Sequence, residues 1–307
     1  MTEQELDVLF TRLLPKFDAW LSAHKPWKQN MTLPSTETYR VDPSSAFMRY
    51  STCSSRDFFH PEFQRISALI DVPLNFHRKY WEWVFIIHHA IRTGSVGEGT
   101  RGLVFGVGQE ALPAVFAQMG CFITATDAPF QIALDTGWSK SNQFATALAT
   151  LPNGPMDRAA FERQVEWREC DMNNIDPSLQ GYDFCWSSCC LEHLGTLKAG
   201  ADFIINSVLN TLKVGGVAIH TTEFNVSSNT DTLESGSTVI YRRRDLEALV
   251  AEIRAMGHEV DDFVIAPDNL VIDNYVDTPP FSQFPHLKLR IENYVSTSAG
   301  LIIRRMK

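Results

Sequence analysis

Short apolar runs alternate with longer segments of helical spacing through the middle of the chain, residues 102–223. The first apolar run, Leu103 to Phe105, stops at Gly106, and residues 110–118 then space their apolar positions as a helix does. A second apolar run at residues 121–125 completes a strand–helix–strand unit. This alternation predicts an α/β fold, in which helices cover both faces of a mostly parallel sheet.

Further apolar runs extend the alternation toward the C-terminus. A third strand is predicted at residues 165–170, and a fourth opens at Asp183. A fifth strand ends at His220 after a helix and a Lys-x-Gly-Gly turn. The remaining predicted elements are a helix at residues 242–256 and strands at residues 259–266 and 295–304.

The segment between the last two predicted strands, residues 267–293, is too long for a hairpin. It carries several side chains that could hold a ligand: Asp273, Tyr275, Asp277 and His286. We therefore expect a substrate-binding insertion there.

The N-terminal residues 1–95 form a predicted helical appendage to a domain that spans residues 96–307. Residues 5–24 have the spacing of an amphipathic helix, residues 25–55 are rich in Pro, Ser and Thr, and residues 61–92 are again helical with many aromatic side chains. Two interpretations stay open. The appendage is a lid or wall over the substrate site, or it is a layer that covers the sheet or forms a homodimer contact.

Composition narrows the class of partner. The chain has 307 residues, 44% hydrophobic and 21% charged, as in soluble globular proteins. Its net charge of −9 argues against a nucleic acid or an anionic membrane as the main partner. No apolar run approaches a membrane span, the first residues are acidic rather than those of a signal peptide, and the six cysteines have no CxxC spacing. We expect a cytoplasmic protein that acts on a small molecule.

The glycine turn after the first strand predicts a nucleoside site. Gly106 and Gly108 let the backbone turn sharply and leave no Cβ between the chain and a ligand. Asp127, at the tip of the second strand, is placed to accept hydrogen bonds from ribose hydroxyls. Glu110 lies near the helix start, where the dipole tolerates an acid but a pyrophosphate would be repelled. These residues favour a nucleoside without phosphate over NAD.

Two later segments extend this site. Asp171 and Met172 follow the third strand, where a polar group and an apolar side chain would suit adenine. Ser187 and Ser188 end the fourth strand and are followed by Leu-Glu-His-Leu at residues 191–194.

Residues 102–223 resemble the class I S-adenosylmethionine-dependent methyltransferases. The resemblance rests on the glycine turn, the acid at position 127 and the Asp-led strand before Leu-Glu-His-Leu. The resemblance implies a seven-stranded Rossmann-like sheet in the order 3-2-1-4-5-7-6, with the last strand antiparallel. It also implies S-adenosylmethionine as cofactor. The chain departs from the family at Val104, where an acid is usual, and at Glu110, where a third glycine is usual. The cofactor residues expected are Phe105, Gly106, Gly108, Glu110, Asp127, Asp171, Met172, Ser187 and Ser188.

Methyl transfer to a hydroxyl oxygen of a small molecule, such as a sugar or secondary metabolite, needs alignment and often a base. His193 and His220 are the candidate bases, because both are predicted at the carboxyl ends of strands, where open α/β sheets bind ligands. If the chain turns between them, His220 and Glu223 can hold a divalent or iron ion together with His286. Such an ion would acidify the acceptor hydroxyl. In the alternative interpretation, His220 and Glu223 hydrogen-bond loop backbone and His286 is a surface or packing residue.

Two other functions are compatible with the same residues. The first is an NAD(P)-dependent reductase on a similar sheet, against which stand Glu110 and the absence of a Tyr-x-x-x-Lys pair. The second is a cofactor-binding protein without catalysis, which would bind S-adenosylmethionine without turnover.

Overall fold

The computed structural model describes residues 2, 41–42, 44–135, 143–282 and 284–307. The helix predicted at residues 5–24 therefore lies outside the described residues. Within them, no helix is long and apolar enough to cross a membrane.

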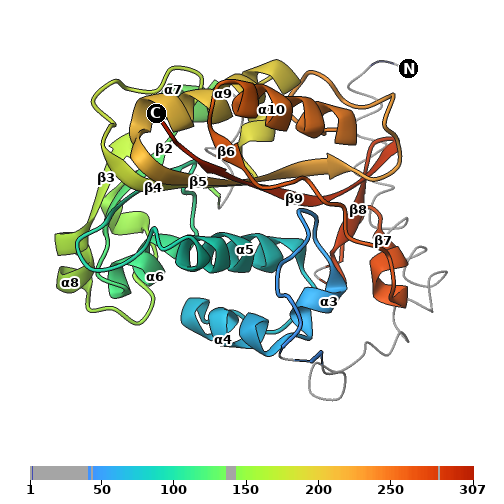
Figure 1. The fold of residues 1–307 in the computed structure, drawn as a ribbon, viewed down its shortest axis with the longest axis horizontal. Coiled ribbons are helices and arrows are strands. Elements are labelled where there is room, and N and C mark those ends of the chain that lie inside the picture. The colour runs from blue at the N-terminus through green and yellow to red at the C-terminus, as the bar shows by residue number, and fades with distance from the viewer. Residues whose placement is uncertain (1, 3–40, 43, 136–142, 283) are drawn as a thin grey trace.

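A nine-stranded sheet forms the centre of the molecule (Figure 1). Its first five strands pair in parallel in the order β3-β2-β1-β4-β5. The next strand in space, β9, runs antiparallel to β5, and β6 pairs with the far edge of β9. The predicted α/β class is confirmed, and the strands pair as 3-2-1-4-5-7 with β9 in the seventh place. The order differs from the prediction beyond β9, where β6 shares the edge with β8. The strands are β1 (Arg101–Phe105), β2 (Phe122–Asp127), β3 (Val165–Glu169), β4 (Tyr182–Ser188), β5 (Leu212–Asn225), β6 (Glu259–Val260), β7 (Val276–Asp277), β8 (Lys288–Ile291) and β9 (Tyr294–Arg304).

The predicted insertion at 267–293 contains two of these strands, which raises the count from seven to nine. β8 pairs antiparallel with β9, and only Glu292 and Asn293 separate them. Glu292 has a φ of +50°, as tight hairpin turns require. A hairpin therefore closes the C-terminal part of this segment, and β7 extends the sheet beyond it.

The predicted strand 259–266 is shorter than expected, because another segment takes its place at the edge of β9. Ser51 and Cys53 pair there: Gly300 N donates to Ser51 O (2.7 Å) and Cys53 N donates to Ser298 O (2.9 Å). The chain after Val260 pairs with this segment instead, since Ser51 N donates to Val264 O (2.7 Å). The N-terminal region thus fills the gap between β6 and β8.

Helices cover both faces of the sheet (Figure 1). One face is covered by α4, α5, α6 and α8, and the other by α7, α9 and α10. Each layer encloses its own hydrophobic core. The α-helices are α3 (Ser55–Phe58), α4 (Pro61–Ile70), α5 (Arg78–Arg92), α6 (Leu112–Gln118), α7 (Phe130–Asp135), α8 (Arg158–Gln164), α9 (Leu197–Asn206) and α10 (Arg243–Ala255). The short helical segments of the described residues are η2 (Leu148–Thr150), η3 (Leu191–His193), η4 (Ser207–Thr211, a π-helix) and η5 (Val271–Asn274).

Helix α5 packs directly on β4, β5 and β9. Its Trp81 and Phe85 are fully buried. Gly300 of β9 makes this close approach possible, because a Cβ at that position would overlap the ring of Phe85. His77 caps the helix, its Nδ1 accepting from Lys79 N (3.1 Å). The first turn of α5 is thereby fixed against the strands beneath it.

Candidate functional site

The glycine turn and the acid of β2 meet at the carboxyl edge of the sheet. Gly106 and Gly108 have φ values of +62° and +52°, which favour glycine. Gly108 N donates to Oδ2 of Asp127 (3.0 Å), as does Ala145 N (3.0 Å), and Ala128 N donates to Oδ1 (2.8 Å). Burial raises the pKa of Asp127, and these three backbone donors oppose the rise. The turn and the carboxylate thus form one hydrogen-bonded unit at the tips of β1 and β2.

Other residues expected at the cofactor lie around this turn. The ring of Phe105 packs on Phe203 of α9, so its backbone rather than its side chain borders the turn. Met172 is buried, with its sulfur 3.8 Å from where a Cβ on Gly106 would lie. Asp171 accepts from Asn173 N (2.9 Å) and forms the turn after β3.

Glu110 points away from the glycine turn. Its Oε1 accepts from Nε1 of Trp186 (2.7 Å) on the α5 face of the sheet. Burial raises the pKa of this carboxyl group to about 8. Glu110 therefore carries less charge at neutral pH than an exposed glutamate would.

The two serines that end β4 also point into the protein. Ser187 Oγ lies 2.8 Å from Nδ1 of His220, and Ser188 Oγ donates to Glu82 (3.3 Å). The other ring nitrogen of His220 lies 3.0 Å from Ser207 Oγ. His220 is buried, and burial lowers its pKa to about 3. Its imidazole is thus neutral, with both nitrogens engaged by hydroxyls.

The structure does not bring His220, Glu223 and His286 together as metal ligands. β5 continues without a turn to Asn225, and residues three apart on a strand face opposite sides. His220 accordingly faces Phe203 of α9, whereas Glu223 faces α5. His286 lies elsewhere: its Nδ1 is 2.8 Å from Oδ2 of the buried Asp277, and its ring stacks on His77 at 4.7 Å.

His193 lies in η3, directly after β4. Its Nδ1 is 2.7 Å from the carbonyl oxygen of Ser237. Because a carbonyl oxygen can only accept, Nδ1 is the donor in this contact.

A charged cluster that the sequence did not predict lies under the first turn of α5, at the carboxyl ends of β4 and β5. Glu82 is fully buried, and its carboxylate accepts from Lys79 Nζ (2.8 Å) and Cys189 Sγ (3.1 Å). Arg78 forms an ion pair with Glu223 and lies 3.5 Å from Glu82. Despite burial, Lys79 and Arg78 lower the pKa of Glu82 to about 2.

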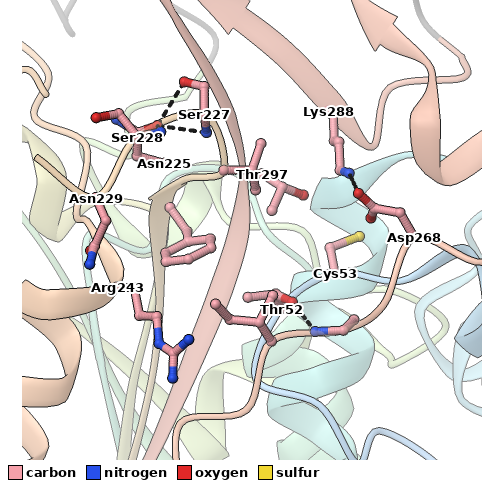
Figure 2. A pocket seen from close by; sticks show the side chains of 14 residues that line it. Thr52, Cys53, Asn225, Ser227, Ser228, Asn229, Arg243, Asp268, Lys288 and Thr297 are labelled. Atoms are coloured by element: carbon pink, nitrogen blue, oxygen red, sulfur yellow. Dashed lines mark hydrogen bonds and ion pairs between the residues drawn. The ribbon is translucent and has the colours of Figure 1, made fainter. Parts of the chain in front are cut away.

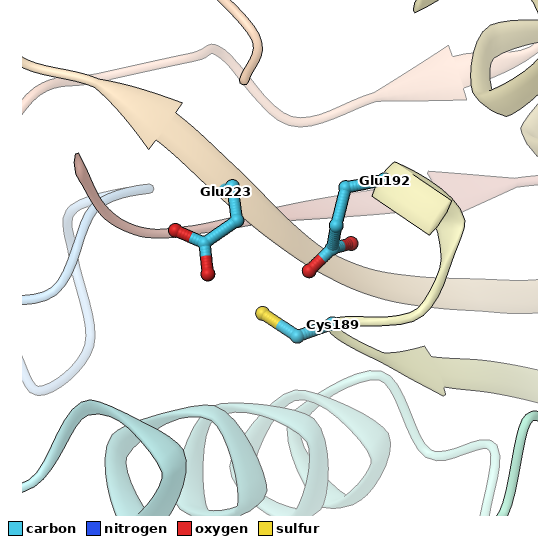
Figure 3. Close-up of side chains that lie close together, drawn as sticks. All are labelled: Cys189, Glu192 and Glu223. Atoms are coloured by element: carbon cyan, nitrogen blue, oxygen red, sulfur yellow. The ribbon is translucent and has the colours of Figure 1, made fainter. Parts of the chain in front are cut away.

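Cys189 and two glutamates form the centre of this cluster (Figure 3). The sulfur of Cys189 and carboxylate oxygens of Glu192 and Glu223 all lie within 4.8 Å of one another. The backbone of Cys189 has a φ of +49°, which aims the thiol into the cluster just after β4. Burial, together with Glu192 and Glu82, raises the pKa of this thiol well above its usual range.

The sequence contains a signal for part of this cluster. Arg78, Lys79 and Glu82 stand at positions i, i+1 and i+4 of a helix, a spacing that places both cations beside the acid. The pairing of Glu82 with Cys189 joins positions 107 residues apart. Only the fold brings them together.

A pocket of about 290 Å³ lies beyond the carboxyl end of β5 (Figure 2). Its wall is rich in hydroxyl and amide groups, including those of Thr52, Asn225 and Thr297. An ion pair between Lys288 and Asp268 (2.6 Å) crosses one side of it. The pocket is therefore suited to a polar ligand.

Comparisons with known proteins find solved structures that are similar to the chain at low sequence identity. No protein-family model matches the chain, and no curated protein does. A putative sarcosine dimethylglycine methyltransferase from Galdieria sulphuraria is similar at 13% identity and a TM-score of 0.45, over 74% of this chain and 84% of that one.

Two further structures are similar over most of both chains. The 1,6-didemethyltoxoflavin-N1-methyltransferase of Burkholderia thailandensis, bound to S-adenosylhomocysteine, has 13% identity and a TM-score of 0.38, over 80% of this chain and 79% of that one. A TehB-like SAM-dependent methyltransferase from Corynebacterium glutamicum has 12% identity and a TM-score of 0.39, over 79% and 95%. At such identities, a function must be argued from the chain's own motifs and contacts.

Proposed function

We propose that this protein is an enzyme that transfers a methyl group from S-adenosylmethionine to a hydroxyl oxygen of a small molecule. The observation that carries the proposal is the hydrogen bond from Gly108 N to Asp127 Oδ2 (3.0 Å), which joins the glycine turn to the acid of β2. It lies at the carboxyl edge of a sheet that keeps the predicted strand order as far as β9.

The residues at this edge fit the nucleoside. An ionised carboxylate has about four acceptor positions, and backbone N–H groups fill three of those on Asp127, which leaves one for a ribose hydroxyl. Gly106 and Gly108 would border the methionine part, and Met172 would pack beside the base. When bound, the cofactor supplies a sulfonium with an electrophilic methyl group.

We place the acceptor hydroxyl of this proposal beside Cys189, Glu192 and Glu223. Cys190 joins this place to the cofactor side, because its thiol donates to Phe105 O (3.4 Å) at the end of β1. Burial in this charged cluster would exclude water and orient a hydroxyl group by hydrogen bonds to carboxylates.

The pocket beyond β5 supports a sugar or another polyol as the acceptor. It is lined by residues that follow Glu223 along the chain, from Phe224 to Asn229.

Metal assistance is not part of this proposal. Among the described residues, one group of potential ligands is close enough for an ion, namely Cys189, Glu192 and Glu223. Arg78 already neutralises Glu223 there. A cytoplasmic location and a homodimer contact stay predictions.

Calorimetry with S-adenosylhomocysteine tests the proposal. We expect binding to the wild type and at least tenfold weaker binding to Asp127→Asn, because an amide offers one acceptor oxygen instead of two. Release of S-adenosylhomocysteine during a screen of polyols and phenols would then identify the acceptor. Binding of NADPH instead would favour a reductase, and binding without turnover on any acceptor would favour a non-catalytic protein.

A further inference from the structure

We infer that Glu192 contacts the methyl acceptor and takes the proton that its hydroxyl group loses. The inference rests on the methyl-transfer function proposed above and assigns one residue of the same site. It differs from the sequence-based expectation, which gave this role to His193 or His220.

Glu192 is buried at the meeting point of the cofactor and acceptor sides. It lies in η3, two residues after Cys190, which contacts the end of β1. Glu192 is only 1% exposed, and its carboxylate points toward Cys189 and Glu223 (Figure 3). A hydroxyl group held between these three side chains would contact Glu192 directly.

The three buried carboxylates of the cluster differ in their partners. Glu82 is bound by Lys79 and Arg78, and Glu223 by Arg78 and the hydroxyl of Ser296. Glu192 forms no ion pair among the described residues, and its Oε2 accepts from Thr222 Oγ1 (3.2 Å).

That difference separates structural acids from a reactive one. A buried carboxylate that is held by a cation can take up a proton only if its ion pair is broken. In the described part of the chain Glu192 forms no ion pair, and its carboxylate accepts from the hydroxyl of Thr222. Glu82 and Glu223 hold α5 against the sheet, and Glu192 is left to exchange a proton.

The electrostatic environment agrees with this role. Burial, and then the charge of Glu223, raise the pKa of Glu192, while His193 and Lys79 oppose the rise. A carboxylate with a raised pKa is a stronger base than an exposed one. The charged and titratable groups around Glu192 are His193 in η3, Lys79 and Arg78 in α5, Glu223 in β5, Tyr241, and the thiols of Cys189 and Cys190.

The reaction balances with this assignment. The acceptor oxygen forms a bond to the methyl carbon as the carbon–sulfur bond breaks, and the electron pair of that bond remains on sulfur as a thioether. The hydroxyl proton passes to the carboxylate of Glu192, which later releases it to solvent.

The test compares Glu192→Gln with the exposed control Glu252→Gln in the full-length protein. Calorimetry with S-adenosylhomocysteine should give dissociation constants within about twofold of the wild type for both variants, since Glu192 faces the acceptor. In infrared titrations, the carbonyl stretch of a protonated buried carboxyl group should be weaker in Glu192→Gln alone. Loss of nucleoside binding in Glu192→Gln, or an unchanged infrared titration, would overturn the assignment.

Turnover completes the test with the acceptor found by the screen. Glu192→Gln should lose about 100-fold or more in kcat, with the acceptor KM within a few-fold, and Glu192→Asp should recover part of kcat. An unchanged kcat in Glu192→Gln, or the same loss in His193→Asn alone, would show that Glu192 is not the base. Absence of nucleoside binding by the wild type would instead remove the proposed function, and this inference with it.

Discussion

Arg78 of α5 and Glu223 of β5 form an ion pair at the carboxyl edge of the sheet. Neither side chain is freely exposed, at 14% and 5% of its accessible surface. The same guanidinium donates to Ser298 Oγ (3.1 Å) on β9. One cation thus joins a helix to two strands at the point where we place the acceptor.

Removing this cation should destabilise the protein strongly. Arg78→Met leaves Glu223 buried without its ion pair, which costs about 3–5 kcal/mol in the free energy of unfolding. Urea denaturation measures this loss. The control is Arg65→Met, which breaks an exposed pair with Glu62 and should cost less than about 1 kcal/mol. Equal losses in the two variants would show that the buried pair is no stronger than a surface pair.

Glu110 should make the protein less stable as the pH rises. Its pKa is about 8 in the folded protein and near 4.5 in the unfolded chain, so the folded state holds one more proton between these values. The free energy of unfolding should therefore fall with pH across this range, by on the order of 1 kcal/mol per pH unit. Glu110→Gln should remove that slope. Urea denaturation between pH 5 and pH 8 (roughly the range between the two pKa values) checks it, and parallel curves would contradict it.

The glycine turn offers a pair of variants that separates strain from steric overlap. Gly108 and Gly215 both have a positive φ, but a Cβ on Gly108 would lie 2.6 Å from Gln143 O, whereas one on Gly215 meets no atom within 4 Å. Gly215→Ala should cost about 1 kcal/mol in stability and leave S-adenosylhomocysteine binding unchanged.

Gly108→Ala should cost more and weaken that binding at least tenfold, because the turn must move away from residue 143. Calorimetry and thermal unfolding measure both effects. Equal binding by the two variants would place the nucleoside away from the turn.

Cys189 should react slowly with alkylating reagents. Burial and the neighbouring carboxylates raise the pKa of its thiol well above its usual range, and only the thiolate is nucleophilic. At pH 8, reaction with iodoacetamide should be at least tenfold slower than that of a free cysteine (pKa about 8.5). Glu192→Gln should accelerate it, and mass spectrometry of the labelled peptide measures both rates. Rapid labelling of Cys189 in the wild type would show that its thiol is not buried beside carboxylates.

The strands of the sheet could be predicted from the sequence because local patterns mark where each one ends. The apolar runs that end at Gly106 and Asp127 each form a strand, and the hydrogen bond between Gly108 and Asp127 follows from that geometry. The predicted turn between His220 and Glu223 is absent from the structure. No local sequence pattern tells whether β5 turns after His220 or continues to Asn225. Pairing with β9 decides that it continues.

The charged cluster around Glu82 could not be predicted for a related reason. Glu82 belongs to a helix whose pattern is that of a packing helix, and its burial depends on Cys189 and Ser298, both more than 100 residues away. The short β6 has the same origin, since a distant N-terminal segment competes for the edge of β9. Contacts of this kind depend on tertiary competition, which hydrophobic periodicity does not encode.

The short pairing of Ser51 and Cys53 with β9 has a consequence for how the chain can be divided. A fragment that starts at residue 96 would lack both this pairing and α5, exposing backbone groups of β9 and the buried faces of three strands. The fragment would still hold the glycine turn, but the open edge of its sheet would be prone to pair with other copies of the chain. Folding of the sheet and closure of its edge by upstream residues should therefore be a single cooperative event.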